Sequence, residues 1–430
     1  LTSKASAEEV GAVPEDEIGP ELETFIQLAL ETVARLRTTQ PVIAALALEL
    51  LDKAMPFSPV TNVLAVVSKL VESDDVPRQT SGFSLFASRV AAMPANSQDR
   101  TTVATFTPVI VKAAVEVVEA SLSTSQRGSD AEALRQAALD ALKTIASSAQ
   151  PSEHGSLASS LPALVKLGQA AAKAQDARSA VPAAARISVF SITRRLTTKL
   201  GPRLIPHIAA LVPFCLGVVS RPSATVAGAA DSDSDSEDAQ DTAPGAAKSN
   251  VSSLRTGALD TLTGLFGSVP TFMTSYVGAV IRLAVSPELK AAIASASGSS
   301  TASERSLTQL VSTLVRKTPA KEVFEATFRV WDDEMGAEVP ADAKAERLVG
   351  VAEFLGRALR QSDREAISAT YKLVYRFLLR ALEARTADEG RSFFSRPGGG
   401  NRIGDQLAGE GITLVSDPAD PATPGTPFGE

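Results

Sequence analysis

The sequence predicts an all-α protein in which helical pairs stack into an α-solenoid. The main evidence is an internal repeat: residues 134–142 (LRQAALDAL) return 120 residues later as residues 254–262 (LRTGALDTL). Leu, Arg, Ala, Leu, Asp and Leu keep their relative places, at a spacing that suits a helix. The composition agrees, because 44% of the residues are hydrophobic and 5% are aromatic, with hardly any strand-like alternation.

The bulk composition excludes several classes of function. A net charge of -7 and a pI near 5.2 argue against a protein that coats nucleic acid through charge alone. Cys215 is the only cysteine, so no disulfide framework is expected, and with only His154 and His207 beside it we expect no metal or other cofactor. The longest apolar run, 204–219, is shorter than the ~20 residues of a membrane-spanning helix, so no membrane contact is expected. The chain starts at Leu1 without a visible signal peptide, and we expect it to be part of a longer protein.

The first elements follow from helical periodicity. Residues 1–20 show no period and are predicted to be a disordered lead. A helical apolar stripe then begins, formed by Leu22, Phe25, Ile26, Leu30 and Val33. A second helix is predicted over 41–51, ending before Pro56, and a third over 61–71.

A rhythm of first and second helices can be followed from there. Each first helix is expected to carry a proline near its start, at Pro108, Pro162 and Pro206, because a proline in the first turn removes no helical hydrogen bond. Each second helix carries an early arginine: Arg135, Arg186 and Arg255. The intervals of 51 and 69 residues exceed the ~40–47 of standard HEAT repeats, and we assign the excess to loops.

The second helices have a shared packing face. Leu134, Ala138, Leu142 and Ile145 fall on one side, as do their counterparts Leu254, Ala258, Leu262 and Leu265. The small alanines allow a neighbouring helix to approach closely. Asp140 and Asp260 fall off this stripe, and we expect them to be solvated or to cap a neighbouring turn. One such pair cannot bury its own apolar face, so the pairs must stack.

An acidic loop interrupts the predicted stack at 221–250. Its segment 231–238 (DSDSDSED) has no apolar residue, so nothing offsets the entropy cost of ordering it. Ser232, Ser234 and Ser236 lie between carboxylates and are candidate sites for acid-directed kinases. A loop that merely increases solubility explains the same residues equally well.

The helical pattern continues after residue 300. Leu307, Leu310, Val311 and Leu314 form one stripe, and Phe324, Phe328 and Trp331 are expected in the core. A long final helix ends near Arg385, with a predicted apolar stripe at Ile367, Tyr371, Val374, Leu378 and Leu382. The Gly/Pro-rich tail 393–430 is predicted to be disordered.

Residues that could support chemistry are scarce, and we predict no enzyme. The sequence has no phosphate-binding glycine loop, no nucleophile elbow and no paired-histidine metal motif. His207 at a helix start is expected to cap or pack. Asp332 and Asp333 are adjacent, so a helix would point them to different sides, and we expect them to face water. No catalytic or cofactor-binding residue, and no small-molecule substrate, is assigned.

Two clusters of basic residues are candidate contacts for RNA or an acidic protein. Lys372, Arg376 and Arg380 follow at i, i+4, i+8 on the final helix, where like charges repel and an anionic partner would relieve them. The second cluster surrounds a helix end, where cations also suit the helix dipole: Arg194, Arg195, Lys199 and Arg203. A solvated helix face is the alternative for either cluster.

Several segments together resemble the family of U3 small nucleolar RNA-associated protein 10, a large HEAT-repeat component of the small-subunit processome. The segments, in order, are Thr61 to Val90, Leu200 to Phe214 (LGPRLIPHIAALVPF), Leu254 to Pro287, and then Leu310 to Asp332 with Leu348 to Arg385. The last two are similar to the start of the family's C-terminal conserved domain. The likeness spans roughly 40–390, while the acidic loop and the tail depart from the family pattern.

The resemblance implies a role and a domain plan. It implies a nucleolar, non-catalytic scaffold in 18S pre-rRNA processing that supports rDNA transcription, with processome proteins as partners and U3 snoRNA and pre-rRNA as direct or indirect ones. The predicted regions are a disordered lead (1–20), HEAT-like repeats (21–220), an acidic disordered loop (221–250), HEAT-like repeats leading into the C-terminal conserved domain (251–392) and a disordered tail (393–430). The alternative is a HEAT scaffold of another class, a nuclear-transport receptor or a phosphatase scaffold, whose shorter repeats fit these intervals less well.

Overall fold

A computed structural model of the chain is helical throughout the part that it describes. That part comprises residues 24–26, 28–29, 32–33, 36, 39–54, 59–94, 97, 99–123, 129–173, 183–220, 244–294, 300–337 and 340–387, and it contains no strand. The predicted lead 1–20, the tail 393–430 and the acidic segment 231–238 lie outside it. Two compact units are present: 1–276 together with 288–317, and 277–287 together with the residues from 318 onward.

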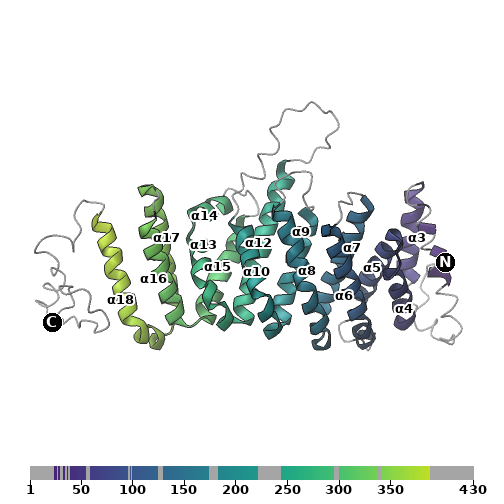
Figure 1. The fold of residues 1–430 in the computed structure, drawn as a ribbon, viewed down its shortest axis with the longest axis horizontal. Helices are drawn as coiled ribbons and strands as arrows, with labels where there is room; N and C mark the ends of the chain where they lie inside the picture. Colours follow the sequence, from purple (N-terminus) through teal and green to yellow (C-terminus); the bar gives the residue numbers. More distant parts are fainter. Residues whose placement is uncertain are drawn as a thin grey trace, which may run out of the picture. The chain divides into compact units, whose positions relative to one another are not determined.

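The first unit is a two-layer stack of helical pairs (Figure 1). One layer contains the first helices, namely α4 (Val60–Val71), α6 (Asp99–Ser123), α8 (His154–Lys173) and α10 (Ile208–Val219). The other contains the second helices, namely α5 (Val76–Ala92), α7 (Ser129–Ser148), α9 (Ala183–Lys199), α12 (Pro244–Ser268) and α15 (Ser300–Lys317). Successive helices of each layer pack on one another, and α4, α6, α8 and α10 pack on α5, α7, α9 and α12 respectively, which confirms the predicted array of helical repeats.

Short elements complete this unit. The helix α3 (Pro41–Ala54) precedes the first full pair and packs on α5. The 3-10 turns η2 (Pro151–Glu153), η3 (Gly201–His207) and η4 (Pro270–Tyr276) connect one pair to the next, and α14 (Pro287–Ala294) precedes α15. The helix α12 begins six residues before the predicted end of the acidic loop at residue 250.

Small residues let neighbouring second helices approach closely. The predicted packing face is confirmed, because Leu134, Ala138, Leu142 and Ile145 and their counterparts in α12 are all buried. Glycines bring α9 and α12 closer still: a Cβ on Gly257 would lie 2.7 Å from the Cβ of Phe190, and one on Gly264 would lie 2.2 Å from Oγ1 of Thr197. The ring of Phe190 also stacks on Phe214 of α10, with ring centroids 4.9 Å apart, so it joins the two layers.

The prolines of the first helices are not where the sequence predicted them. Pro108 and Pro162 lie inside α6 and α8, which begin well before them, and Pro206 lies in the turn η3. Pro108, Pro162 and Pro213 of α10 are all exposed. A proline inside a helix leaves one carbonyl without its N–H partner, and on an exposed face water can bind that carbonyl. The rule of a proline in the first turn is therefore wrong here.

The second unit contains α13 (Val277–Val285), α16 (Ala320–Gly336), α17 (Ala341–Gln361) and α18 (Arg364–Ala387). The helix α16 packs on the other three, and its Trp331 is in the core as predicted, 4.9 Å from Phe377 between ring centroids. The predicted stripe of α18 is wrong in part, because Tyr371 and Leu378 are 58% and 47% exposed. The buried face carries Val374 and Phe377, since the aromatic partners on α16 select the side of α18 that holds Phe377.

Two helical stretches, Asp99–Leu122 and Gly201–Val219, are long and apolar enough to cross a membrane by length and composition. Both belong to the layer of first helices, in which α6 packs on α4 and α8, while α10 packs on α8 and on its pair partner α12. On α6 the outward face is polar, with Lys112 and Glu116 forming an exposed i,i+4 ion pair. A helix that packs within an array passes the same test, so length and composition alone do not indicate a span here.

Candidate partner-binding surfaces

The structure describes the side chains of two of the three basic residues predicted as a cluster on the final helix. Lys372 is exposed on α18, whereas Arg376 is half-buried and already interacts within the chain. The side chain of Arg380 lies outside the described residues, as do Ser232, Ser234 and Ser236. The partner contacts assigned to these residues therefore stay predictions.

In the second cluster, Arg194 has a partner inside the stack. Its Nη1 lies 2.9 Å from Oδ2 of Asp260 on α12, and the Asp260 side chain is 17% exposed. The expectation that Asp260 is solvated or caps a turn is therefore wrong: it links two second helices. Asp140, at the same place in the first copy of the repeat, accepts a hydrogen bond from the Gln136 amide, which also contacts the hydroxyl of Ser188 on α9. Both repeat copies thus use this position to reach α9.

Arg195 and Lys199 bind the end of the preceding second helix. Arg195 donates a hydrogen bond to the hydroxyl of Ser147 over 2.5 Å, and Lys199 Nζ donates to the carbonyls of Ser147 and Ala149 over 2.6 and 3.5 Å. The last carbonyls of a helix lack intrahelical partners and carry the negative end of the helix dipole. Lys199 therefore caps the C-terminus of α7, and Arg195 binds a side chain of its last turn, while both keep part of their surface in solvent.

Further cations lie along the same edge of the first unit. Because the helices alternate in direction, the loops that join one pair to the next all lie at one edge, and the contacts between the ends of α7 and α9 confirm this. Arg100, at the start of α6, donates to the carbonyls of Val90 in the last turn of α5 and of Met93 just after that helix. Nη1 of Arg203 lies 3.3 Å from the position of a Cβ on Gly155, next to His154.

We call this set of five residues the inter-pair ridge: Arg100, His154, Arg195, Lys199 and Arg203. Arg195 and Arg203 are exposed and the other three are half-buried. Sequence reasoning missed Arg100 and His154, since they are far from the other three in the chain. The signal that could have found them is their position, because each lies at the start of a first helix.

The members of the inter-pair ridge influence one another electrostatically. Burial lowers the pKa of His154, and the charges of Arg203 and Lys199 lower it further, against the opposing effect of Glu153. The pKa of Lys199 is lowered by burial, with Arg195 and Arg100 adding to the effect and Glu153 opposing it. Glu153 is itself buried, and its carboxylate accepts bonds from the Gln150 N–H and the Thr107 hydroxyl. The ridge therefore keeps a surplus of positive charge.

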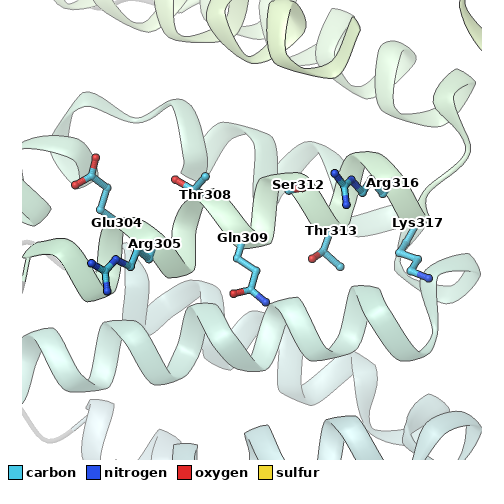
Figure 2. Close-up of a pocket in the computed structure, with 8 residues that line it drawn as sticks. All are labelled: Glu304, Arg305, Thr308, Gln309, Ser312, Thr313, Arg316 and Lys317. Carbon is cyan, nitrogen blue, oxygen red and sulfur yellow. The ribbon is translucent and has the colours of Figure 1, made fainter. Parts of the chain in front are cut away.

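Two shallow polar surfaces lie on the second helices. Figure 2 shows the first, in which eight side chains follow one face of α15: Glu304, Arg305, Thr308, Gln309, Ser312, Thr313, Arg316 and Lys317. The second is a groove between α9 and α12, lined in part by Ser191, Arg194, Ser253, Thr256 and Asp260. Both offer hydrogen-bonding groups over an open surface rather than an enclosed pocket.

The residues expected to be inert have ordinary structural surroundings. Cys215 is fully buried, which raises the pKa of its thiol and keeps it protonated. His207 is half-buried at the end of η3, and burial lowers its pKa. Asp332 and Asp333 are exposed, as expected, but Asp333 also pairs with Arg282 of α13 over 2.5 Å. Among the described residues no three His, Cys, Asp or Glu side chains are placed to hold a metal ion.

Comparison with known proteins shows what the chain is similar to. No family model matches the chain. The chain is 66% identical over 386 residues to U3 small nucleolar RNA-associated protein 10 of Mycosarcoma maydis. The match covers 89% of this chain and 17% of the relative, so the chain spans about a sixth of the relative's length. The resemblance predicted from the sequence is confirmed, because the chain is similar to a part of U3 small nucleolar RNA-associated protein 10.

Proposed function

We propose that the chain is part of a non-catalytic scaffold of the U3 small nucleolar ribonucleoprotein and the small-subunit processome. In this role it acts in the nucleolus on 18S pre-rRNA processing and supports rDNA transcription. The observation that carries the proposal is the 66% identity over 386 residues to a U3 small nucleolar RNA-associated protein. The likeness of 310–332 and 348–385 to the family's C-terminal domain favours a place in the C-terminal part of that protein.

The architecture supports a scaffold. A stack of helical pairs presents long helix faces and rows of loops, on which several partners can bind at once. The described polar surfaces are open and run along helices, as on α15 and between α9 and α12. Recognition of proteins or RNA over an extended area needs such surfaces, whereas catalysis needs converging groups in an enclosed site.

Affinity purification of the full-length protein tests the proposal. We expect U3 snoRNA and processome proteins to be recovered with it, and a fluorescent fusion to concentrate in the nucleolus. Recovery of transport cargo or phosphatase subunits, without U3 snoRNA or processome proteins, would instead favour a HEAT scaffold of another class.

A further inference from the structure

The two edges of the first unit differ in charge. The inter-pair ridge places five basic groups along three successive loops of one edge. The exposed carboxylate on the same edge is Asp99. Its charge raises the pKa of Arg89 on α5, while burial, the larger effect, lowers that pKa. The opposite edge carries the exposed carboxylates Glu72, Asp74 and Asp75 between α4 and α5, and Asp130 and Glu132 at the start of α7, although Asp75 pairs with Arg78 over 3.4 Å. A polyanion is therefore attracted more strongly to the edge that carries the ridge.

The ridge is continuous from loop to loop. Lys199 and Arg195 reach from the end of α9 to the end of α7, and Arg203 lies against Gly155 at the start of α8. Arg100 is close enough to Lys199 for its charge to lower the pKa of that amine. Arg100 and Lys199 are held by contacts to backbone carbonyls and Arg195 by the Ser147 hydroxyl, so these cations have fixed positions. A fixed row of cations is what successive phosphates of one strand require.

An exposed aromatic side chain follows in the next loop of the same edge. The Ser268 hydroxyl at the end of α12 donates to the carbonyl of Thr197 on α9 over 2.5 Å, so η4 continues the row of loops. Phe272 of η4 is 52% exposed, although Met273 beside it is fully buried. Among the exposed large apolar residues of the described part, it is the one that lies in a loop between two pairs. An exposed phenyl ring beside a cationic row suits an unpaired base.

We propose that the inter-pair ridge and Phe272 together form a direct binding surface for single-stranded RNA. The ridge cations hold successive phosphates, and one unpaired base stacks on the ring of Phe272. Because neighbouring helices pack about 10 Å apart, the four loops from Arg100 to Phe272 extend over about 30 Å, enough for several nucleotides. The inference rests on the function proposed above, in which the chain is part of a ribonucleoprotein. It goes beyond that function by assigning direct contact and the residues that make it.

The charge component is tested on the purified chain by fluorescence anisotropy with a labelled single-stranded RNA of about 20 nucleotides. Replacing Arg195, Lys199 and Arg203 by Ala should weaken binding by about tenfold or more, and should lower the slope of log Kd against log salt by about 2. The matched control removes three exposed cations elsewhere in the first unit, Lys112, Lys166 and Lys290, and should leave both values unchanged. Equal losses in both triple variants would overturn the proposal.

The contacts of Arg195 and Lys199 to α7 require a structural check. Circular dichroism and thermal unfolding establish whether the triple variant is folded. Arg203→Ala leaves the contacts to α7 intact, and it should still weaken RNA binding and lower the salt slope by about 0.7. An unchanged affinity in a folded Arg203→Ala protein would count against the ridge.

The stacking component separates RNA from an acidic protein as the occupant. Phe272→Ala should weaken binding of the single strand by about tenfold without changing the salt slope, because stacking releases no counterions. The affinity for duplex RNA, whose bases are already stacked, should not change. If polyglutamate competes as well as RNA does and Phe272→Ala has no effect, the edge binds acidic protein and the RNA proposal fails.

The same variants in cells distinguish this proposal from the proposed function. If the ridge variants lose RNA binding in vitro and the full-length protein still recovers processome proteins, both proposals stand. If the purified chain fails to bind RNA but the full-length protein recovers the processome, only the ridge proposal is wrong. If RNA binds the ridge but no processome component is recovered, the scaffold assignment is wrong.

Discussion

Arg194 on α9 and Asp260 on α12 form an ion pair of 2.9 Å between two neighbouring second helices. Asp260 belongs to the nonamer that repeats in the sequence, and Asp140 of the other copy connects to α9 through Gln136 and Ser188. The repeated aspartate therefore helps to fix how one second helix sits on the next. Asp260 makes this contact between repeats directly, whereas Asp140 takes part in it only through Gln136.

Replacing Asp260 by Ala should destabilise the first unit by about 0.5–1 kcal/mol. The pair is partly exposed, so solvent screening keeps its contribution small, and Arg194 can regain hydration when its partner is lost. Chemical denaturation followed by circular dichroism measures the change. Asp140→Ala should cost less, because Asp140 accepts a single hydrogen bond from its own helix. A larger loss for Asp140 would contradict this account.

Gly257→Ala in α12 should destabilise the protein by about 1–3 kcal/mol. The added Cβ would lie 2.7 Å from Phe190, whose ring is already stacked on Phe214, so the helices must move apart. The control is Gly267→Ala in the same helix, where nothing lies within 4 Å of the new Cβ. That change should stabilise by up to about 1 kcal/mol because alanine favours a helix. Equal shifts in the two unfolding midpoints would refute the close approach.

Acidification should destabilise the protein partly through His154. Its pKa is lowered in the folded state by burial and then by Arg203 and Lys199, so the unfolded state binds the proton more readily. Neutral His154 therefore contributes its full stability above the pKa of the unfolded state, about 6.5. This contribution is lost as the pH falls through the lower pKa of the folded state. Unfolding midpoints at pH 7.5 and 5.5 should differ less in His154→Gln than in the unchanged protein. If the unfolding midpoint shifts equally with pH in both proteins, His154 does not contribute to the destabilisation by acid.

The basic stripe of α18 gives a prediction about assembly. Changing Lys372, Arg376 and Arg380 together to Glu should weaken recovery of the processome with the full-length protein while helicity is retained. Arg376 is half-buried and interacts within the chain, so Lys372→Glu alone is the milder test of the exposed part. If recovery of the processome is unchanged with either variant, the basic stripe is a solvated helix face.

The acidic segment gives a prediction about modification. An acid-directed kinase should phosphorylate the chain at Ser232, Ser234 or Ser236, and each phosphate adds about two negative charges. Mass spectrometry of the treated protein identifies the sites, and the triple Ser→Ala protein is the control. If the control protein still incorporates phosphate, other residues of the chain are the phosphorylated ones.

The sequence predicted the helices and their stacking because those depend on local periodicity and repeats. The buried faces of α7 and α12 followed from leucine spacing alone. What it could not predict depended on neighbours in space. Tyr371 fits the apolar stripe of α18, yet α16 selects the face with Phe377, and Asp260 finds its partner 66 residues away in Arg194. The inter-pair ridge was half predicted, because only the three cations close together in sequence were visible as a cluster.

The exposed prolines give the two layers different mechanical character. Pro108, Pro162 and Pro213 each remove one backbone hydrogen bond on the outer side of a first helix, whereas the second helices of the first unit have no proline beyond their first turn. When a partner bends or stretches the first unit, we expect the first helices to bend at their prolines. The second helices should stay straight.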